Sequence, residues 1–232
     1  DDMVSRGLGD VYKRQDDHQC SNSQLGVMAL TPSTMLPLGT ALPAFQLTRV
    51  SGCLSGGSSP ETLSHVALPS RPVLFMLLCA HCPFVMHVEP ELSRLERDFG
   101  SAVTLLGIAS NSINTHPQDG PEGLRQQAMR HHWTFPYLLD EQQTLAKELR
   151  GACTPEFFLF APDLSNRQTL RYRGQLDGSR PGNEVPLDGR DLRAALDAVL
   201  KGEAVSEVQQ PSIGCNIKWH PGQEPPWFGT PA

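Results

Sequence analysis

The chain has 232 residues, which is enough for one well-buried domain with an appendage but tight for two full domains. Its formal net charge of −6 comes without a basic patch, and this excludes nucleic acid as a default partner. The longest apolar run, Pro72 to Ala80, is far shorter than the ~20 residues that a membrane span needs. We therefore expect a globular protein with neither a nucleic-acid nor a membrane partner.

The first 27 residues are treated separately. They lack the charged, apolar and small-residue pattern of a secretory signal. The stretch DMVSRGLGDVYKRQ is similar to translated adapter sequence at the ends of metagenome-assembled reading frames. We expect the natural start at Met28 and a leader, 1–27, that takes no part in the fold; a genuine disordered leader is the alternative.

The elements that follow are predicted from apolar runs and from apolar residues at spacings of three and four. In chain order we expect a strand at 44–50, a flexible loop at 51–60, a strand at 72–78, a helix at 82–100, a strand at 103–109, a helix at 121–133, an extended piece at 135–140, a helix at 143–149, strands at 157–161 and 168–174, and a helix at 188–202. The two late strands are close enough to pair as a hairpin. A tail, 203–232, is expected to pack on the domain formed by 28–202.

The fold class follows from this order of elements. Strands that alternate with helices form βαβ units with parallel strands, and the closing hairpin adds antiparallel ones. The sequence therefore predicts an α/β fold with a central mixed sheet flanked by helices, an N-terminal extension and a C-terminal tail.

Two cysteines, Cys79 and Cys82, stand between the apolar strand and the helix that follows it. Backbone N–H groups and the partial positive charge of a helix start lower a thiol pKa from ~8.5 into roughly the 3.5–7.5 range. The chain has six cysteines, and one close pair with the others dispersed is typical of redox or metal chemistry in a reducing compartment. We therefore expect a cytoplasmic protein.

Four interpretations of this CxxC pair compete. The first is half of a zinc site that Cys153 and Cys215 complete, and the second is a pair of core residues. The third is a dithiol/disulfide exchange centre, and the fourth is a peroxide-reducing thiol beside its resolving partner. The position at a strand-to-helix junction favours the last two interpretations. We expect neither a metal nor an organic cofactor.

The strand, the CxxC pair and the helix, followed later by CTPEFFL, resemble the thioredoxin superfamily. This resemblance implies a thioredoxin-like fold in which Pro155 is the cis-proline facing the active site, and in which Thr154 and Pro155 shape the substrate groove.

A closer resemblance rests on CAHCPFV, SNS…HPQDGPE, FPYLLDE, ACTPEFFLF and IGCNIKW. Together they are similar to a peroxiredoxin-like (AhpC/TSA, redoxin-type) subgroup of bacterial proteins, over roughly 38–228. Two departures from ordinary peroxiredoxins stand out. Phe75 and Cys79 replace the proline and threonine of the peroxidatic frame, and the Thr154-Pro155 region replaces the activating arginine. The departures favour a dithiol over a peroxidase.

The resemblance also implies roles for individual residues. By thioredoxin logic Cys79 is the exposed nucleophile at the helix N-cap, and Cys82, one turn further in, resolves the mixed disulfide. His81 either stabilises the Cys79 thiolate or is simply exposed on the turn. By peroxidase logic the roles are exchanged: Cys82 is oxidised to a sulfenic acid and Cys79 resolves it.

Two further cysteines are auxiliary candidates. Cys153 is either a small buried residue or a second redox partner on the loop facing Cys79. Cys215 lies in the tail, where it forms a disulfide with Cys153 or acts as a late resolving thiol if the tail packs near the site.

The leading hypothesis is a thiol–disulfide oxidoreductase that acts on a disulfide-containing protein or a small thiol, with a thioredoxin- or glutathione-type reductant. The alternatives are a thiol-dependent peroxidase with Cys82 as the peroxidatic cysteine, and a non-catalytic zinc- or partner-binding module on the same fold.

Overall fold

The computed structural model describes residues 30–54 and 61–229. The predicted leader, 1–27, and the predicted start at Met28 lie outside these residues, as does most of the predicted flexible loop. Within the described part of the chain, no helix combines the length and apolar character needed to cross a membrane.

Most of the strands form one seven-stranded sheet with the order β3-β2-β6-β5-β4-β8-β9. The members are β2 (Gln46–Ser51), β3 (Thr62–Ser64), β4 (Val73–Leu77), β5 (Thr104–Ala109), β6 (Tyr137–Leu139), β8 (Glu156–Pro162) and β9 (Gln168–Gly174). Strand β5 runs parallel to both β4 and β6, whereas β8 is antiparallel to β4 and β9. The predicted mixed sheet and its closing hairpin are therefore confirmed.

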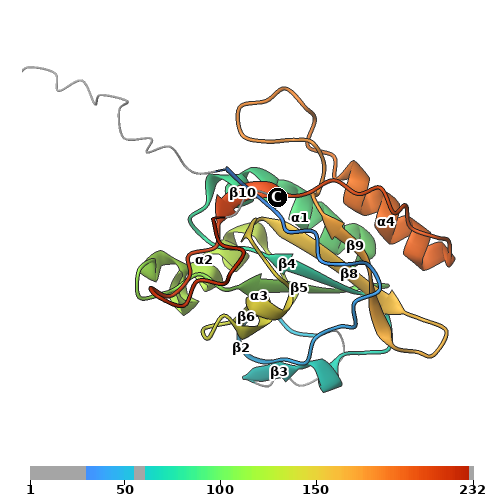
Figure 1. Ribbon diagram of the computed structural model, residues 1–232, viewed down its shortest axis with the longest axis horizontal. Helices are drawn as coiled ribbons and strands as arrows, with labels where there is room; N and C mark the ends of the chain where they lie inside the picture. Colours follow the sequence, from blue (N-terminus) through green and yellow to red (C-terminus); the bar gives the residue numbers. More distant parts are fainter. Residues whose placement is uncertain (1–29, 55–60, 230–232) are drawn as a thin grey trace, which may run out of the picture.

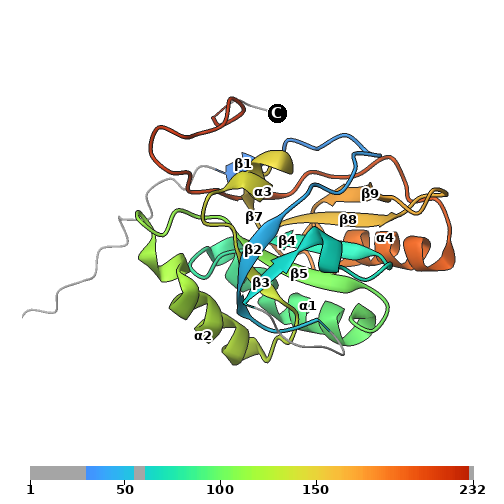
Figure 2. The same ribbon diagram turned by 90° about the horizontal axis from the view of Figure 1, so that it is seen from below.

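In the described part of the chain, four α-helices cover the two faces of this sheet. They are α1 (Pro83–Phe99), α2 (Pro121–His131), α3 (Thr144–Glu148) and α4 (Arg190–Lys201). Helices α1, α2 and α4 lie on one face, and the short α3 lies on the other (Figure 2). Two separate apolar cores result, one on each side of the sheet. Every residue of β4 is buried because both of its faces are covered.

Helix α1 carries the cysteine pair at its start. Its buried apolar residues follow one helical face: Val85, Val88, Leu92, Leu95 and Phe99. Pro83 occupies the first turn, where its missing N–H has no partner to lose. Pro90 lies in the middle of this helix, is exposed, and does not interrupt the helical span.

A second, smaller sheet has the order β1-β10-β7 and joins distant parts of the chain. It consists of β1 (Leu30–Pro32), β7 (Cys153–Thr154) and β10 (Ile213–Asn216). The central strand, β10, belongs to the C-terminal tail and lies antiparallel to both neighbours. In Figure 1 this strand crosses close to the start of α1. The sequence predicted none of these three strands.

Candidate active site

The strand-to-helix junction places the two cysteines differently from the prediction. Strand β4 ends at Leu77, and α1 begins only at Pro83, so that Cys82 is the N-cap residue and Cys79 lies in the preceding loop. The prediction that Cys79 caps the helix and is the more exposed thiol is therefore wrong. Both cysteines are completely buried, with 0% of their surface exposed.

Cys79 belongs to the apolar core and has polar contacts with two other elements. Its Sγ lies 3.3 Å from the Thr154 hydroxyl, and its carbonyl oxygen accepts a hydrogen bond of 3.1 Å from Gln127 of α2. Burial, together with the hydrogen bond to Cys82 and the charge there, raises the pKa of Cys79 well above its ordinary value. Cys79 is therefore the thiol that keeps its proton.

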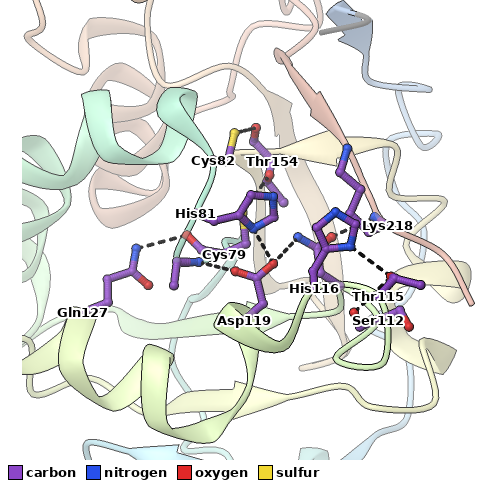
Figure 3. Close-up of polar contacts among 12 residues, drawn as sticks. Cys79, His81, Cys82, Ser112, Thr115, His116, Asp119, Gln127, Thr154 and Lys218 are labelled. Carbon is purple, nitrogen blue, oxygen red and sulfur yellow. Dashed lines mark hydrogen bonds and ion pairs between the residues drawn. The ribbon is translucent and has the colours of Figure 1, made fainter. Parts of the chain in front are cut away.

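The groups around Cys82 lower the pKa of its thiol and so favour the thiolate form. Hydrogen bonds from the Cys215 and Cys79 thiols lower its pKa, burial opposes them, and the Val85 backbone amide and the Thr154 hydroxyl add to the lowering. In the protonated form, Cys82 Sγ lies 3.5 Å from the Thr154 carbonyl oxygen and donates to it (Figure 3). The helix start thus activates Cys82 rather than Cys79.

Cys215 is the third sulfur of this group. Its hydrogen bond to Cys82, followed by burial, raises the pKa of Cys215, so it donates to the Cys82 sulfur. Cys82 is therefore the central sulfur, with one thiol donor on each side. All three cysteines are free thiols in this structure.

Cys153 does not join the other three sulfurs, although Thr154 and Pro155 do contact the site. The Thr154-Pro155 peptide bond is cis, as the resemblance implied. Adjacent residues of a strand point to opposite sides. Thr154 consequently faces the pair, while Cys153 Sγ lies 3.9 Å from the Pro155 carbonyl oxygen. Neither the predicted Cys153–Cys215 pairing nor a role for Cys153 beside Cys79 has a contact to support it.

Asp119 is a site residue that the sequence analysis missed. It is fully buried, and one carboxylate oxygen accepts from the Ala80 backbone N–H at 2.8 Å. The other oxygen is 2.6 Å from His81 Nδ1 and accepts from the Asn111 amide at 2.8 Å (Figure 3). His81 therefore pairs with a carboxylate, a contact that neither predicted alternative, stabilising the Cys79 thiolate or simple exposure on the turn, included. The only hint in the sequence was the polar loop HPQDGPE.

This polar cluster continues to the C-terminal tail. The His81 and His116 rings stack with their centroids 5.0 Å apart. The Lys218 backbone N–H donates to Asn111 Oδ1 at 2.8 Å, and Lys218 accepts from the Ser112 N–H at 2.7 Å. The loop that holds Asp119 and the tail that holds Cys215 are thus fastened to each other beside the dithiol.

Metal binding was tested on the donor groups of the described residues. The four cysteines of the predicted zinc site do not form a ligand set, because Cys153 points elsewhere. The one group of three donors found within residues 30–54 and 61–229 is Cys79, His81 and Asp119, with ligand atoms within 4.8 Å of one another. Asp119 Oδ2 already accepts from His81 and Asn111 and Oδ1 accepts from the Ala80 N–H, so an ion bound here would compete with these hydrogen bonds.

Glu156 is a buried acid immediately after Pro155. Its Oε2 accepts from the Ala152 N–H at 3.0 Å, within the turn that leads into β7. Burial nevertheless raises the pKa of Glu156 to about 8, because the amides of Ala152 and Cys153 offset the desolvation only in part. The side chain is therefore a neutral acid at pH 7.

Glu156→Gln is expected to flatten the pH dependence of stability. The folded-state pKa is raised above the unfolded value of ~4.3, so the unfolded state releases this proton first and the wild-type free energy of unfolding falls as pH rises toward 8. Glutamine keeps the neutral form. Urea unfolding should show that the wild-type protein loses about 2–3 kcal/mol more than the variant between pH 5.5 and 8.5. Glu203→Gln, at an exposed position, is the matched control; parallel pH profiles for wild type and Glu156→Gln would contradict the expectation.

Comparison with known proteins places the chain in a family. A family model described as AhpC/TSA family matches residues 38–171. An uncharacterized conserved protein from Geobacillus kaustophilus is 43% identical, with a TM-score of 0.75, over 84% of this chain and 98% of the other. A hypothetical protein from Sinorhizobium meliloti 1021 is 36% identical, with a TM-score of 0.74, over 83% and 100%.

More distant structures share the fold. A candidate DsbE thiol:disulfide interchange protein from Chlorobium tepidum has a TM-score of 0.53 at 11% identity, over 71% of this chain and 99% of that one. No curated protein sequence matches the chain. The thioredoxin-like fold is confirmed by these structures, and a redox function in general agrees with the buried dithiol. On the family match and on the two relatives above 30% identity, the chain belongs to the AhpC/TSA family.

Proposed function

We propose that the protein is a thiol–disulfide oxidoreductase in which Cys82 attacks and Cys79 resolves. One observation carries this proposal: Cys82 is the N-cap residue of α1, where a thiolate is favoured, whereas Cys79 lies in the preceding loop, where burial raises the pKa of its thiol. The sequence analysis assigned the attack to Cys79 on the basis of a helix cap that belongs to Cys82.

The exchange proceeds in two balanced steps. The Cys82 thiolate attacks one sulfur of a substrate disulfide, forming a mixed disulfide and releasing the other sulfur, which takes up a proton. Cys79 then loses its proton and attacks Cys82 Sγ, which forms the Cys79–Cys82 disulfide and releases the second substrate thiol. The substrate gains two electrons, and the dithiol loses them.

The groups around Cys82 support disulfide exchange over peroxide reduction. Its sulfur is stabilised by Cys215, Cys79, the Val85 amide and Thr154, all of them uncharged. A guanidinium that would polarise a peroxide oxygen is not among these groups. The neutral surroundings suit a sulfur leaving group, which needs less electrostatic assistance than a peroxide oxygen.

A thiol-dependent peroxidase is the second candidate, and a specific observation favours it. The activated thiolate is Cys82, which is the sulfur that this mechanism requires. Cys79 would then resolve the Cys82 sulfenic acid with loss of water. For either function we propose a thioredoxin- or glutathione-type reductant and a cytoplasmic location, because a reducing compartment keeps the thiols available.

Turnover assays on the wild-type chain separate the candidates. We expect reduced protein to reduce insulin disulfides well above the Cys79→Ser/Cys82→Ser double variant, and to consume hydrogen peroxide no faster than that variant. Cys53→Ser removes an exposed thiol that makes no part of the site and serves as the matched control.

Rapid peroxide consumption with negligible insulin reduction would instead establish the peroxidase. Stoichiometric zinc in purified protein that shows neither activity would support the non-catalytic binding module.

A further inference from the structure

Strand β10 lies along the edge of β7, immediately beside the cis-proline. Cys215 pairs with Thr154 and Asn216 with Cys153 in an antiparallel register. An extended segment that pairs with β7 in this way gives hydrogen-bond partners to backbone N–H and C=O groups that an edge strand otherwise leaves unpaired. The C-terminal tail thus occupies the backbone edge next to the reactive sulfurs.

Gly214 is the residue that allows this close approach. A Cβ atom added there would lie 2.1 Å from the Thr154 carbonyl oxygen and 3.4 Å from the Pro155 nitrogen. Since backbone atoms cannot move aside as a flexible side chain can, only glycine fits at this point of the strand. The residue before Cys215 is therefore fixed by the shape of the Thr154-Pro155 turn.

Cys215 contacts Cys82 in the position that the cysteine of a bound substrate would take. It donates to the sulfur that we propose as the nucleophile. With β10 in place, Cys79 and Cys82 have no exposed surface, and 3% of Cys215 is exposed. An external disulfide cannot reach Cys82 until β10 leaves.

Only noncovalent contacts hold β10 in this position. The Ser212 hydroxyl donates to the Gly174 carbonyl at 2.6 Å, and the Ile217 N–H donates to the Ala152 carbonyl at 3.0 Å. Ile213, inside the strand, leaves 37% of its surface exposed. Removing the strand therefore breaks these hydrogen bonds and its pairing with both β1 and β7, but no covalent bond.

We infer that β10 is an internal occupant of the substrate groove, and that the substrate is an extended polypeptide segment whose disulfide-bonded cysteine follows a glycine. Such a segment would add to β7 in place of β10 and present its sulfur to Cys82, a recognition mode known as strand addition. The inference rests on the proposed oxidoreductase function. The exchange itself follows the two steps given above, with the segment's cysteine as the attacked sulfur.

The tail then controls how fast the enzyme reacts. When a binding-competent state is only a fraction of the population, the apparent affinity falls by that fraction. A substrate segment has to compete with a strand attached to the same chain, so a substrate that pairs poorly with β7 is reduced slowly.

Two synthetic substrates test the groove on the wild-type chain alone. One is the disulfide dimer of SIGCNIKW, the sequence of residues 212–219; the other is the disulfide dimer of SIVCNIKW. We expect the wild-type chain to reduce the glycine peptide about ten-fold faster, on the order expected for the loss of one well-formed backbone pairing. Equal rates for the two peptides overturn the inference.

A variant of the chain tests whether β10 blocks access to Cys82. Gly214→Ala introduces the clashing Cβ, so β10 should no longer dock and the glycine peptide should be reduced about ten-fold faster than by wild type. Gly178→Ala is the matched control, because its added Cβ would meet only Val185 Cγ1 at an ordinary 3.5 Å. An unchanged rate in folded Gly214→Ala overturns the claim that β10 blocks the groove.

These outcomes separate this inference from the proposed function. If neither chain reduces any peptide above the Cys79→Ser/Cys82→Ser background, the oxidoreductase function fails and the inference fails with it. If the peptides are reduced at rates that depend on neither the glycine nor the variant, the function stands and only the groove and cover are wrong. The peptide comparison decides even where Gly214→Ala does not fold.

Discussion

Cys82→Ser should reduce disulfide exchange to the level of the double variant, whereas Cys79→Ser should stop turnover after the first step. The reason is the order of attack. Cys82 holds the low-pKa sulfur at the N-cap of α1, and without it no mixed disulfide forms. Without Cys79 the mixed disulfide forms but has lost its neighbouring resolving thiol, so it accumulates.

Mass spectrometry after mixing with the SIGCNIKW dimer measures both effects, with peptide mapping to separate an adduct at the pair from one on the exposed Cys53. Cys79→Ser should gain the mass of one peptide, and Cys82→Ser should stay unmodified at the pair. Cys215 also lies against Cys82, so Cys79→Ser/Cys215→Ser is needed to show that the adduct does not decay through the tail cysteine. If an adduct forms on Cys79 in Cys82→Ser, Cys79 is the attacking thiol, and the assignment of Cys82 as the nucleophile is rejected.

Asp119→Ala should destabilise the protein more than any other substitution in the polar cluster. The change leaves the Ala80 N–H, the His81 ring and the Asn111 amide without their acceptor. Because Asp119 is fully buried, we expect the free energy of unfolding to fall by about 2–4 kcal/mol at pH 7, the usual cost of leaving such groups unpaired. Guanidinium unfolding measures the loss, and Asp197→Ala, at an exposed position of α4, is the control.

The loss should depend on pH in a defined direction. Burial tends to raise the pKa of Asp119, but hydrogen bonds from His81 and Asn111, the charge of His81 and the Ala80 amide lower it overall. A lowered folded-state pKa stabilises the protein fully above the unfolded value of ~3.9 and loses that contribution as pH falls below it. The difference between wild type and Asp119→Ala should therefore shrink below about pH 4. A constant difference down to pH 3 would contradict this account.

The main sheet was predictable because its strands carry their own signals. The apolar run that became β4 and the alternation of strands with helices determine the central order without knowledge of distant contacts. Strands β1, β7 and β10 have only two to four residues and depend on pairing across the length of the chain. Their local sequence holds too few apolar positions for a period to be visible.

The site was predictable to the extent that it lies in one motif. The two cysteines and the Thr154-Pro155 turn lie together as predicted. The N-cap residue is Cys82 and not Cys79, because a proline fits best at the first helical position and Pro83 occupies it. Asp119 was missed because a polar turn contains many acids, and only the folded loop shows which one enters the core. Of the two alternatives for Cys153, the small buried residue agrees with the structure, and only the folded strand shows that its side chain lies on the opposite side from Thr154.

The position of β10 along the chain has a consequence for synthesis. Chains emerge from the ribosome N-terminal end first and can fold as they emerge. The seven-stranded sheet and all four helices precede β10 in the sequence, so Cys79, Cys82 and the Thr154-Pro155 turn can be assembled while the tail is still untranslated. A chain that has emerged only as far as α4 therefore carries a dithiol that β10 does not yet cover, and the dithiol is closed only after β10 has followed.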